Sequence, residues 1–159
     1  MNKKIGLAPI ENADAEFLIL GTMPGDESLM NQEYYANSRN RFWKVIKAVF
    51  GQDLKDYEEK KSFLKEKHIA LWDVLESAQR KGSADADILN ENVNDLEKFL
   101  HDHPKIKKIG FNGKNAFNYF SIYVKPKFKH DDIILVTLPS TSGANGYFKL
   151  ENWIKFFKL

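Results

Sequence analysis

The sequence contains no cysteine, which excludes disulfides, thiolate metal ligands and a cysteine nucleophile. It also contains no apolar run near the roughly 20 residues that a membrane-spanning helix needs, and residues 1–6 lack an apolar leader segment. These absences predict a soluble, cytoplasmic protein with no membrane partner. The length of 159 residues suits one domain, which we expect to cover residues 1–159.

Two groups of functional motif are absent as well. Neither the G-x-x-x-x-G-K-[ST] loop that holds nucleotide phosphates nor the G-x-G-x-x-G dinucleotide fingerprint occurs in the chain. The histidines at positions 68, 101, 103 and 130 lie away from the predicted strand ends, and no pair stands at a metal-ligand spacing beside a carboxylate there. We therefore expect surface histidines, and neither a Ser-His-Asp triad nor a metal site.

The net charge of +2 is small, but its distribution along the chain is uneven. Residues 104–130 contain seven lysines and no Asp or Glu, whereas residues 1–33 contain two lysines and six acidic residues. A basic face of this kind suits the phosphates of a nucleic acid. An ordinary solvated surface carries lysines too, so charge alone leaves both interpretations open.

Apolar runs predict buried strands at residues 17–20, 68–72, 106–111 and 132–138. Helical spacing of apolar residues predicts helices at residues 42–50, 54–67, about 90–100, around 116–120 and 148–157. The polar segment 77–87 is expected to form a connection. Strands that are apolar throughout and alternate with helices indicate a parallel sheet covered on both faces. The predicted fold class is α/β, a three-layer αβα sandwich with a four-stranded parallel sheet.

Each predicted strand ends in polar or turn-forming residues. They are Gly21-Thr22-Met23-Pro24-Gly25, Asp73, Asn112-Gly113 and Pro139-Ser140-Thr141-Ser142. Parallel strands bring these groups to one edge of the sheet, where open α/β folds bind their ligands. Any one of them is also typical of a turn or a helix cap, so it is their convergence that predicts a site.

Three segments resemble the uracil-DNA glycosylase superfamily. They are Gly21-Thr22-Met23-Pro24-Gly25, Asn40-Arg41-Phe42-Trp43-Lys44-Val45-Ile46 and Leu138-Pro139-Ser140-Thr141-Ser142. The first two look like the mismatch-specific uracil/thymine glycosylases. Tyr34-Tyr35-Ala36 and residues 140–145 look closer to the hypoxanthine (deoxyinosine) DNA glycosylases. The likeness runs from residue 17 to the final helix.

The resemblance implies a monofunctional enzyme that flips a damaged base out of DNA and hydrolyses its N-glycosidic bond. Flipping is required because the reacting atoms are shielded inside the base stack. The enzyme must also orient a water and stabilise the negative charge of the departing base. The family uses no metal and no cofactor, and we expect a monomer whose partner is DNA containing a damaged base.

The resemblance also implies site residues. Asn40 is expected to be the catalytic residue that positions the attacking water. The base pocket is expected to contain Gly21, Thr22, Met23, Tyr35, Asp73 and Asn112. DNA contacts are expected from Pro24, Gly25, Ser140, Thr141, Ser142, Asn145 and Tyr147, with the loop 143–147 entering the minor groove.

Each of these roles has a structural alternative. Asn40 and Asp73 are residue types that cap helices, and the loop 143–147 is compatible with a simple helix start. Tyr35 is either a platform that stacks on the flipped base or a core aromatic, in which case Tyr34 is exposed. Phe42 and Trp43 are expected to pack in the core.

Three differences from the uracil enzymes favour hypoxanthine as the substrate. Met23 stands where many members carry an Asp or Asn that positions water, and Leu138 stands where they place a His or Asn. Asp73 replaces an Asn that pairs with uracil, and a carboxylate can only accept hydrogen bonds. It suits N1–H of hypoxanthine, whereas it opposes O4 of uracil with a second acceptor.

Three other functions remain open from the sequence. Within the same class, the substrate is uracil or a mismatched base. Outside it, the chain is a non-catalytic nucleic-acid-binding domain that kept the fold, or a hydrolase of free nucleosides. Release of free base from duplex oligonucleotide, but not from nucleoside, separates these alternatives.

Overall fold

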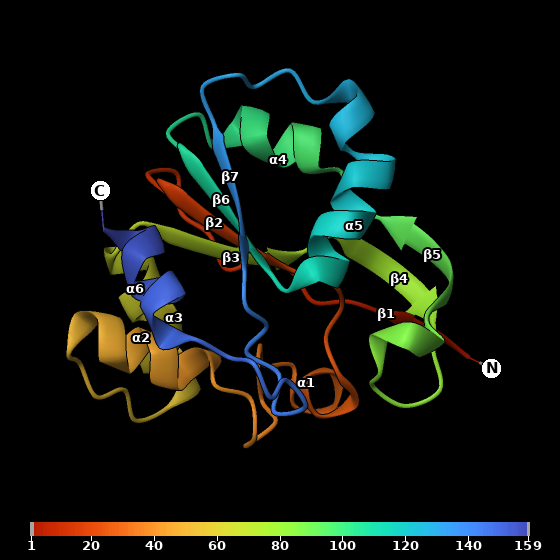
Figure 1. Cartoon of the computed structure of the whole chain (residues 1–159), viewed down its shortest axis with the longest axis horizontal. Helices are drawn as coiled ribbons and strands as arrows, with labels where there is room; N and C mark the ends of the chain where they lie inside the picture. The colour runs from red at the N-terminus through yellow and green to blue at the C-terminus, as the bar shows by residue number, and fades with distance from the viewer. Residues whose placement is uncertain (1, 159) are drawn as a thin grey trace.

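The computed structural model describes residues 2–158, which form a parallel sheet between two layers of helices and a smaller second sheet (Figure 1). The parallel sheet has the order β3-β2-β6-β7. Its strands are β2 Phe17–Gly21, β3 Ile69–Asp73, β6 Lys108–Asn112 and β7 Ile134–Leu138. The predicted α/β class and the four-stranded parallel sheet are therefore confirmed.

Helices cover both faces of this sheet. Their bounds are α1 Asp26–Asn31, α2 Phe42–Phe50, α3 Tyr57–Glu66, α4 Leu96–Asp102, α5 Lys114–Tyr123 and α6 Leu150–Phe157. One apolar cluster joins the sheet to α2, α3 and α6, and the other joins it to α4 and α5 (Figure 1). No helix within residues 2–158 is both long and apolar enough to cross a membrane.

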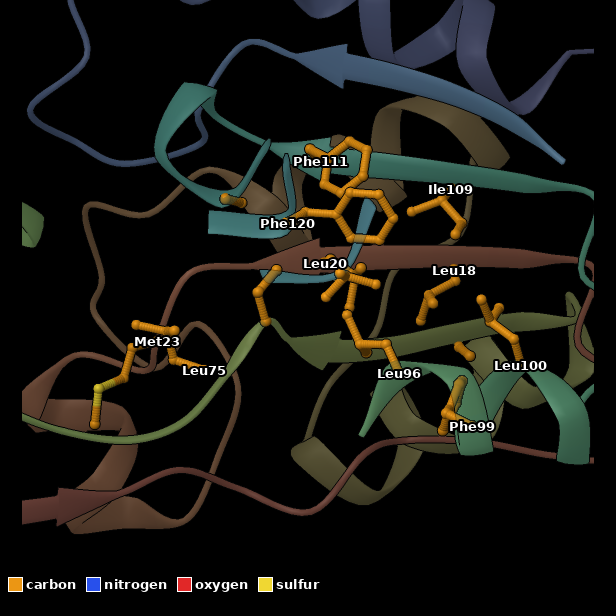
Figure 2. Close-up of a cluster of buried hydrophobic side chains, with 14 of the residues drawn as sticks. Leu18, Leu20, Met23, Leu75, Leu96, Phe99, Leu100, Ile109, Phe111 and Phe120 are labelled. Atoms are coloured by element: carbon orange, nitrogen blue, oxygen red, sulfur yellow. The ribbon is translucent and has the colours of Figure 1, made fainter. Parts of the chain in front are cut away.

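Strand β2 lies inside the sheet and is buried along its whole length. Leu18 and Leu20 contact the cluster of α4 and α5, whereas Phe17 and Ile19 contact the cluster of α2, α3 and α6. Figure 2 shows the first cluster, in which Leu18 and Leu20 lie among side chains of β6, α4 and α5. A strand with apolar neighbours on both faces needs a continuous apolar run, which is why residues 17–20 do not alternate.

The helix after the long loop follows its predicted bounds. Phe42, Val45 and Ile46 are buried on one face of α2, and the chain leaves the helix at Gly51 with a φ of 68°. Glycine adopts this left-handed conformation without a steric penalty, so it ends the helix at the predicted residue. Phe42 is fully buried and Trp43 is partly buried, as expected of core residues.

The segment between β3 and α4 departs from the prediction. Residues 77–87 were expected to be a connection and residues 90–100 a helix, but two strands form here, β4 Leu75–Gln79 and β5 Leu89–Val93. They pair antiparallel and, with β1 Lys3–Ile5, make a second sheet in the order β1-β4-β5. Helix α4 begins only at Leu96, after Asp95 accepts a hydrogen bond from the Lys98 amide at 3.0 Å.

The helical prediction is confirmed for residues 96–100, in α4, but was wrong for residues 90–93, where pairing with β4 outweighs local spacing. Strand β4 follows β3 after Val74 alone. Leu75, Ser77 and Ala78 are buried and Glu76 is exposed, so burial alternates along β4 only in part. Strand β7 also differs from expectation, since Ile134 and Thr137 are exposed at the sheet edge. The other predicted strands and helices are present, with ends that shift by a few residues.

The packing of α6 on the sheet depends on Gly110 in β6. A methyl group at this position would lie 2.8 Å from Cδ1 of Leu138, 2.9 Å from Cζ of Phe156 and 3.1 Å from Cδ1 of Ile19. We expect Gly110→Ala to lower the free energy of unfolding by about 1–3 kcal/mol because it overpacks this contact. Gly146→Ala is the control, since nothing lies within 4 Å of a methyl group there. Equal denaturant midpoints for both variants would contradict this packing.

Candidate active site

The carboxyl ends of the parallel strands meet at one edge, and the pairing of Gly21 with Asp73 sets its centre. A methyl group on Gly21 would lie 2.5 Å from Oδ1 of Asp73 and 3.3 Å from the hydroxyl oxygen of Tyr35. The missing side chain therefore leaves the space that these two polar groups occupy. This explains why glycine follows the apolar run of β2.

Asp73 is a buried carboxyl group, with 5% of its surface exposed. Its Oδ2 has no hydrogen-bond partner within the described residues. Burial raises the pKa of Asp73 to about 7; the charge of Asp85 also raises it, and that of Arg80 lowers it. The chain continues from Asp73 into a strand rather than a helix, so Asp73 is not a helix cap.

Tyr34 lies in the core and Tyr35 lies beside Gly21 at the strand ends. The alternative in which Tyr34 is the exposed tyrosine is therefore wrong. The Tyr35 ring stacks on Phe42 with centroids 4.4 Å apart and 23° between planes, and burial raises the pKa of its hydroxyl. Tyr34 is 4% exposed, and its hydroxyl donates to the Ala8 carbonyl at 2.9 Å. One face of the Tyr35 ring is thus supported by a core aromatic.

Asn112, at the end of β6, joins two loops across the site. Its Nδ2 donates to the Tyr35 hydroxyl at 3.0 Å and to Oγ1 of Thr141 at 2.9 Å. Its Oδ1 accepts from the Thr141 amide at 2.9 Å. The carboxamide is therefore engaged at both ends and orients Tyr35, rather than being a free group for a base.

Asn40 lies where the long loop enters α2. Its Oδ1 accepts a hydrogen bond at 2.9 Å from the amide of Phe42, the first residue of α2, although the residue at the N-cap position is Arg41. A carboxamide oxygen has two lone pairs, and this bond uses one. Asn40 also lines a surface cavity of about 370 Å³ together with Tyr35, Asn37 and Ser38.

The segment 21–25 is fixed mainly through its backbone. The carbonyls of Gly21 and Thr22 accept hydrogen bonds from the amides of Val74 and Leu75, at 2.8 and 3.1 Å. The side chain of Met23 lies beside Leu75 in the apolar cluster (Figure 2) and is 8% exposed. The Met23 side chain therefore belongs to the core, which corrects its assignment to the base pocket.

At the end of this segment, Pro24 and Gly25 meet the loop that follows β4. The Pro24 carbonyl accepts a hydrogen bond from Nη2 of Arg80. Gly25 precedes α1, and a methyl group there would lie 3.3 Å from Oγ of Ser83. The Asp26 amide donates to the same Ser83 oxygen at 2.9 Å. These contacts hold the first loop against residues 80–83.

The loop after β7 is held by its own residues and by Arg41. Thr141 is fully buried, and its carbonyl accepts from the Arg41 amide at 2.8 Å. The Arg41 guanidinium donates to the carbonyls of Ser142 and Asn145, at 2.9 and 3.2 Å. The Ser142 amide donates to Oγ of Ser140 at 3.2 Å. These bonds attach the loop to the residue that follows Asn40.

Within this loop, Asn145 and Tyr147 differ in exposure and contacts. The Asn145 carboxamide donates to the Ser140 carbonyl at 3.0 Å and accepts from the Tyr147 amide at 3.1 Å. The Tyr147 side chain is 89% exposed. Asn145 therefore shapes the loop, and Tyr147 is the large side chain that projects from it.

Sequence analysis missed Arg80, which is 1% exposed. Its Nε donates to the Gly82 carbonyl at 2.9 Å, and its Nη1 lies 3.8 Å from Oδ1 of Asp85 without a hydrogen-bond partner in residues 2–158. Arg80 stands in a polar stretch beside Lys81 and Gly82. No signal in that stretch distinguishes it from a surface arginine.

The histidines make contacts away from this site. His68 pairs with Glu16 at 3.0 Å, and His103 contacts Glu11 at 2.9 Å. His103 is 5% exposed and stacks on Phe99, so its assignment to the surface was wrong. No group of three or more potential metal ligands occurs among the described residues.

The chain was compared with known proteins. The family model for the uracil DNA glycosylase superfamily matches residues 8–158. A hypoxanthine DNA glycosylase of Methanosarcina acetivorans is 38% identical over 91% of this chain and 90% of its own length. One of Methanosarcina barkeri is 34% identical over 90% of this chain and 89% of its own.

A solved structure agrees with these relatives. The solution NMR structure of a provisionally named uracil DNA glycosylase from Methanosarcina acetivorans superimposes with a TM-score of 0.84 and 35% identity. The match covers 98% of this chain and 97% of the other. Family model, relatives and fold agree over nearly the whole length, and the chain belongs to the uracil DNA glycosylase superfamily.

Proposed function

We propose that this protein is a monomeric DNA base-excision glycosylase that hydrolyses the N-glycosidic bond of a flipped, deaminated base, with hypoxanthine as the preferred substrate. The relatives named for hypoxanthine support this proposal, since they cover nine tenths of the chain. The observation that carries it is the buried carboxylate of Asp73, whose Oδ2 lacks a partner at the carboxyl edge of the sheet. A buried acceptor without a donor suits a ligand N–H.

The flipped base lies, in this proposal, between the loop 21–25 and Tyr35. The Tyr35 ring is supported by Phe42 and oriented by Asn112, so it offers a rigid aromatic surface for stacking. Such stacking contributes about 1–3 kcal/mol per base. The backbone of Gly21 and Thr22 completes the wall, because the absence of a side chain on Gly21 lets Asp73 and Tyr35 approach this backbone.

Hydrolysis needs a water on the sugar side and a stabilised leaving base. Asn40 orients the water through the free lone pair of its Oδ1, while the other lone pair keeps the cap on α2. A carboxamide is a weak base, which suffices when the sugar cation forms before the water attacks. Asp73 accepts N1–H of hypoxanthine and orients the base. The base leaves with the electron pair of the broken glycosidic bond and takes up a proton, while the attacking water loses one.

DNA contacts come from the loops around the site. Tyr147 is the side chain that enters the minor groove and occupies the gap left by the flipped base, because it is exposed and Asn145 holds the loop. Ser140, Ser142 and the backbone near Gly25 bind phosphates beside the lesion. Thr141 supports this loop from inside, since it is fully buried.

A panel of duplex oligonucleotides containing inosine, uracil, xanthine or only normal bases tests the proposal. We expect free hypoxanthine to be released fastest and no base to be released from the normal duplex. Deoxyinosine as a free nucleoside is the control, and we expect it to stay intact. DNA binding without base release would instead indicate a non-catalytic domain, and cleavage of the nucleoside would indicate a nucleoside hydrolase.

Asn40→Ala separates catalysis from capping. We expect the single-turnover rate on inosine to fall roughly 100-fold or more, because a catalytic group is lost. The free energy of unfolding should fall by only about 1 kcal/mol, the usual value of a cap. Asn40→Asp is the matched control, since its carboxylate keeps the bond to the Phe42 amide. A near-normal rate for Asn40→Ala in a folded protein would leave Asn40 as a cap alone.

The pKa of Asp73 predicts how the rate of inosine cleavage depends on pH. Its pKa of about 7 reflects burial and the charges of Asp85 and Arg80, with the Tyr35 hydroxyl as a neutral neighbour. The ionised carboxylate accepts N1–H more strongly than the protonated acid does, so inosine cleavage should rise as pH increases through 7. Asp73→Asn should flatten this rise, whereas the exposed control Asp87→Asn should keep it. A flat profile for the unmodified protein would exclude Asp73 as the acceptor.

Asp73→Asn should also change the free energy of unfolding, in a direction that depends on pH. The pKa of Asp73 in the folded protein lies above its ordinary value of 3.8, so the protonated form favours folding. That stability is complete below pH 3.8 and is lost as pH rises through 7. Asp73→Asn should therefore be more stable than the unmodified protein at pH 8 and similar to it at pH 3, as measured by denaturant unfolding.

A further inference from the structure

Two buried polar atoms of opposite kind lack partners in one part of the molecule. One is Oδ2 of Asp73, an acceptor, and the other is Nη1 of Arg80, a donor. Both residues are at most 5% exposed. The segment 21–25 contacts both residues, because Gly21 pairs with Asp73 in the sheet and the Pro24 carbonyl accepts from Nη2 of Arg80. Oδ1 of Asp85 lies 3.8 Å from Nη1 of Arg80. The remaining unpartnered buried atoms among the described residues belong to Glu97 and Ser121, on α4 and α5.

The Arg80 guanidinium is held in a defined orientation. Its Nε donates to the Gly82 carbonyl and its Nη2 to the Pro24 carbonyl, so the planar group cannot turn. Nη1 is then the nitrogen left without an acceptor. A buried donor or acceptor without a partner is costly, so two such atoms of opposite kind beside the two ends of the segment 21–25 point to a ligand that supplies both missing partners.

A donor beside an acceptor matches the edge that deamination creates. Adenine and cytosine present a ring nitrogen that accepts and an amino group that donates. Hypoxanthine and uracil present a ring N–H that donates and a carbonyl oxygen that accepts, and xanthine has this lactam edge too. The order of donor and acceptor is therefore reversed by the chemical change that makes the lesion.

We propose that Arg80 is a specificity-determining residue that donates from Nη1 to the carbonyl oxygen of the flipped base while Asp73 accepts the neighbouring ring N–H. This inference rests on the proposed function and deepens it by naming the recognised edge. Asp73 alone would oppose the carbonyl oxygen with a second acceptor, and Arg80 supplies the missing donor. The pair matches the lactam edge of hypoxanthine, xanthine and uracil, so it removes the opposition to uracil that is expected of Asp73 alone, and it rejects adenine and cytosine.

Guanine carries the same lactam edge, so the pair does not exclude it. Its exclusion follows from the 2-amino group, or from the greater cost of unpairing a G·C pair than a mispaired, deaminated base. Purine over pyrimidine preference is likewise set elsewhere in the pocket. The Asp73–Arg80 pair separates a deaminated base from its parent base.

An atomic substitution in the substrate tests the Arg80 contact. Sulfur in place of O6 of inosine is a much weaker acceptor and leaves N1–H in place. We expect the unmodified protein to cleave inosine faster than 6-thioinosine in duplex DNA, by a ratio that Arg80→Met reduces about ten- to hundredfold. Lys81→Gln is the matched control, because it removes a neighbouring exposed positive charge and should keep the ratio.

The inosine-to-thioinosine ratio also distinguishes a contact of Arg80 with the base from a purely structural role of Arg80. Arg80 holds Pro24 and Gly82, so a purely structural role would slow both substrates equally and leave the ratio unchanged in Arg80→Met. That result would overturn the proposal while inosine cleavage by the unmodified protein still upheld the glycosylase function. No cleavage of any lesion by the unmodified protein would reject the function itself.

A second measurement needs no variant, in case Arg80→Met does not fold. Free bases are added to the unmodified protein and their binding is measured by competition with cleavage of inosine DNA, or by calorimetry. We expect hypoxanthine, xanthine and uracil to bind, and adenine and cytosine to bind at least tenfold more weakly. Adenine binding as tightly as hypoxanthine would overturn the proposed pairing.

Discussion

The carboxamide of Asn112 connects the sheet to both loops that build the site. Its hydrogen bonds hold the Tyr35 hydroxyl on one side and Thr141 on the other. Thr141 in turn accepts the amide of Arg41, whose guanidinium holds the carbonyls of the loop after β7. Asn40 directly precedes Arg41. The end of β6 therefore positions the aromatic surface of Tyr35, the candidate catalytic residue Asn40 and the projecting loop.

This arrangement has a cost in stability that the apolar layers offset. Asp73 and Arg80 are buried charged residues with unpartnered atoms, and the raised pKa of Asp73 means that its ionised form opposes folding. Two apolar clusters flank the sheet and fix its strand ends. A rigid scaffold of this kind allows a strained polar site, which explains why the polar groups gather at the edge and not within the layers.

Much of the fold follows from local sequence. A strand that is buried on both faces needs a continuous apolar run, so residues 17–20 and 68–72 were recognisable, and Gly51 marked the end of α2. The hairpin of β4 and β5 was not recognisable. Its residues have weak alternation, and β5 pairs with β4 only because β3 delivers that strand beside it. Pairing with β4 therefore outweighed the helical spacing at residues 90–93, whereas residues 96–100 are helical.

The sequence by itself determined the fold class, the family and the strand ends at which polar residues meet, because these depend on periodicity and on short motifs. Only the tertiary structure decided which side chains face the site. The Met23 side chain packs in the core, the Asn145 carboxamide forms hydrogen bonds within its own loop, and the Tyr147 side chain is exposed. Arg80 binds Pro24, 56 positions away, and no local pattern encodes such a contact. Hydrogen-bond partners distant in sequence are set by the packing of whole elements, which is why this arginine is visible only in the folded chain.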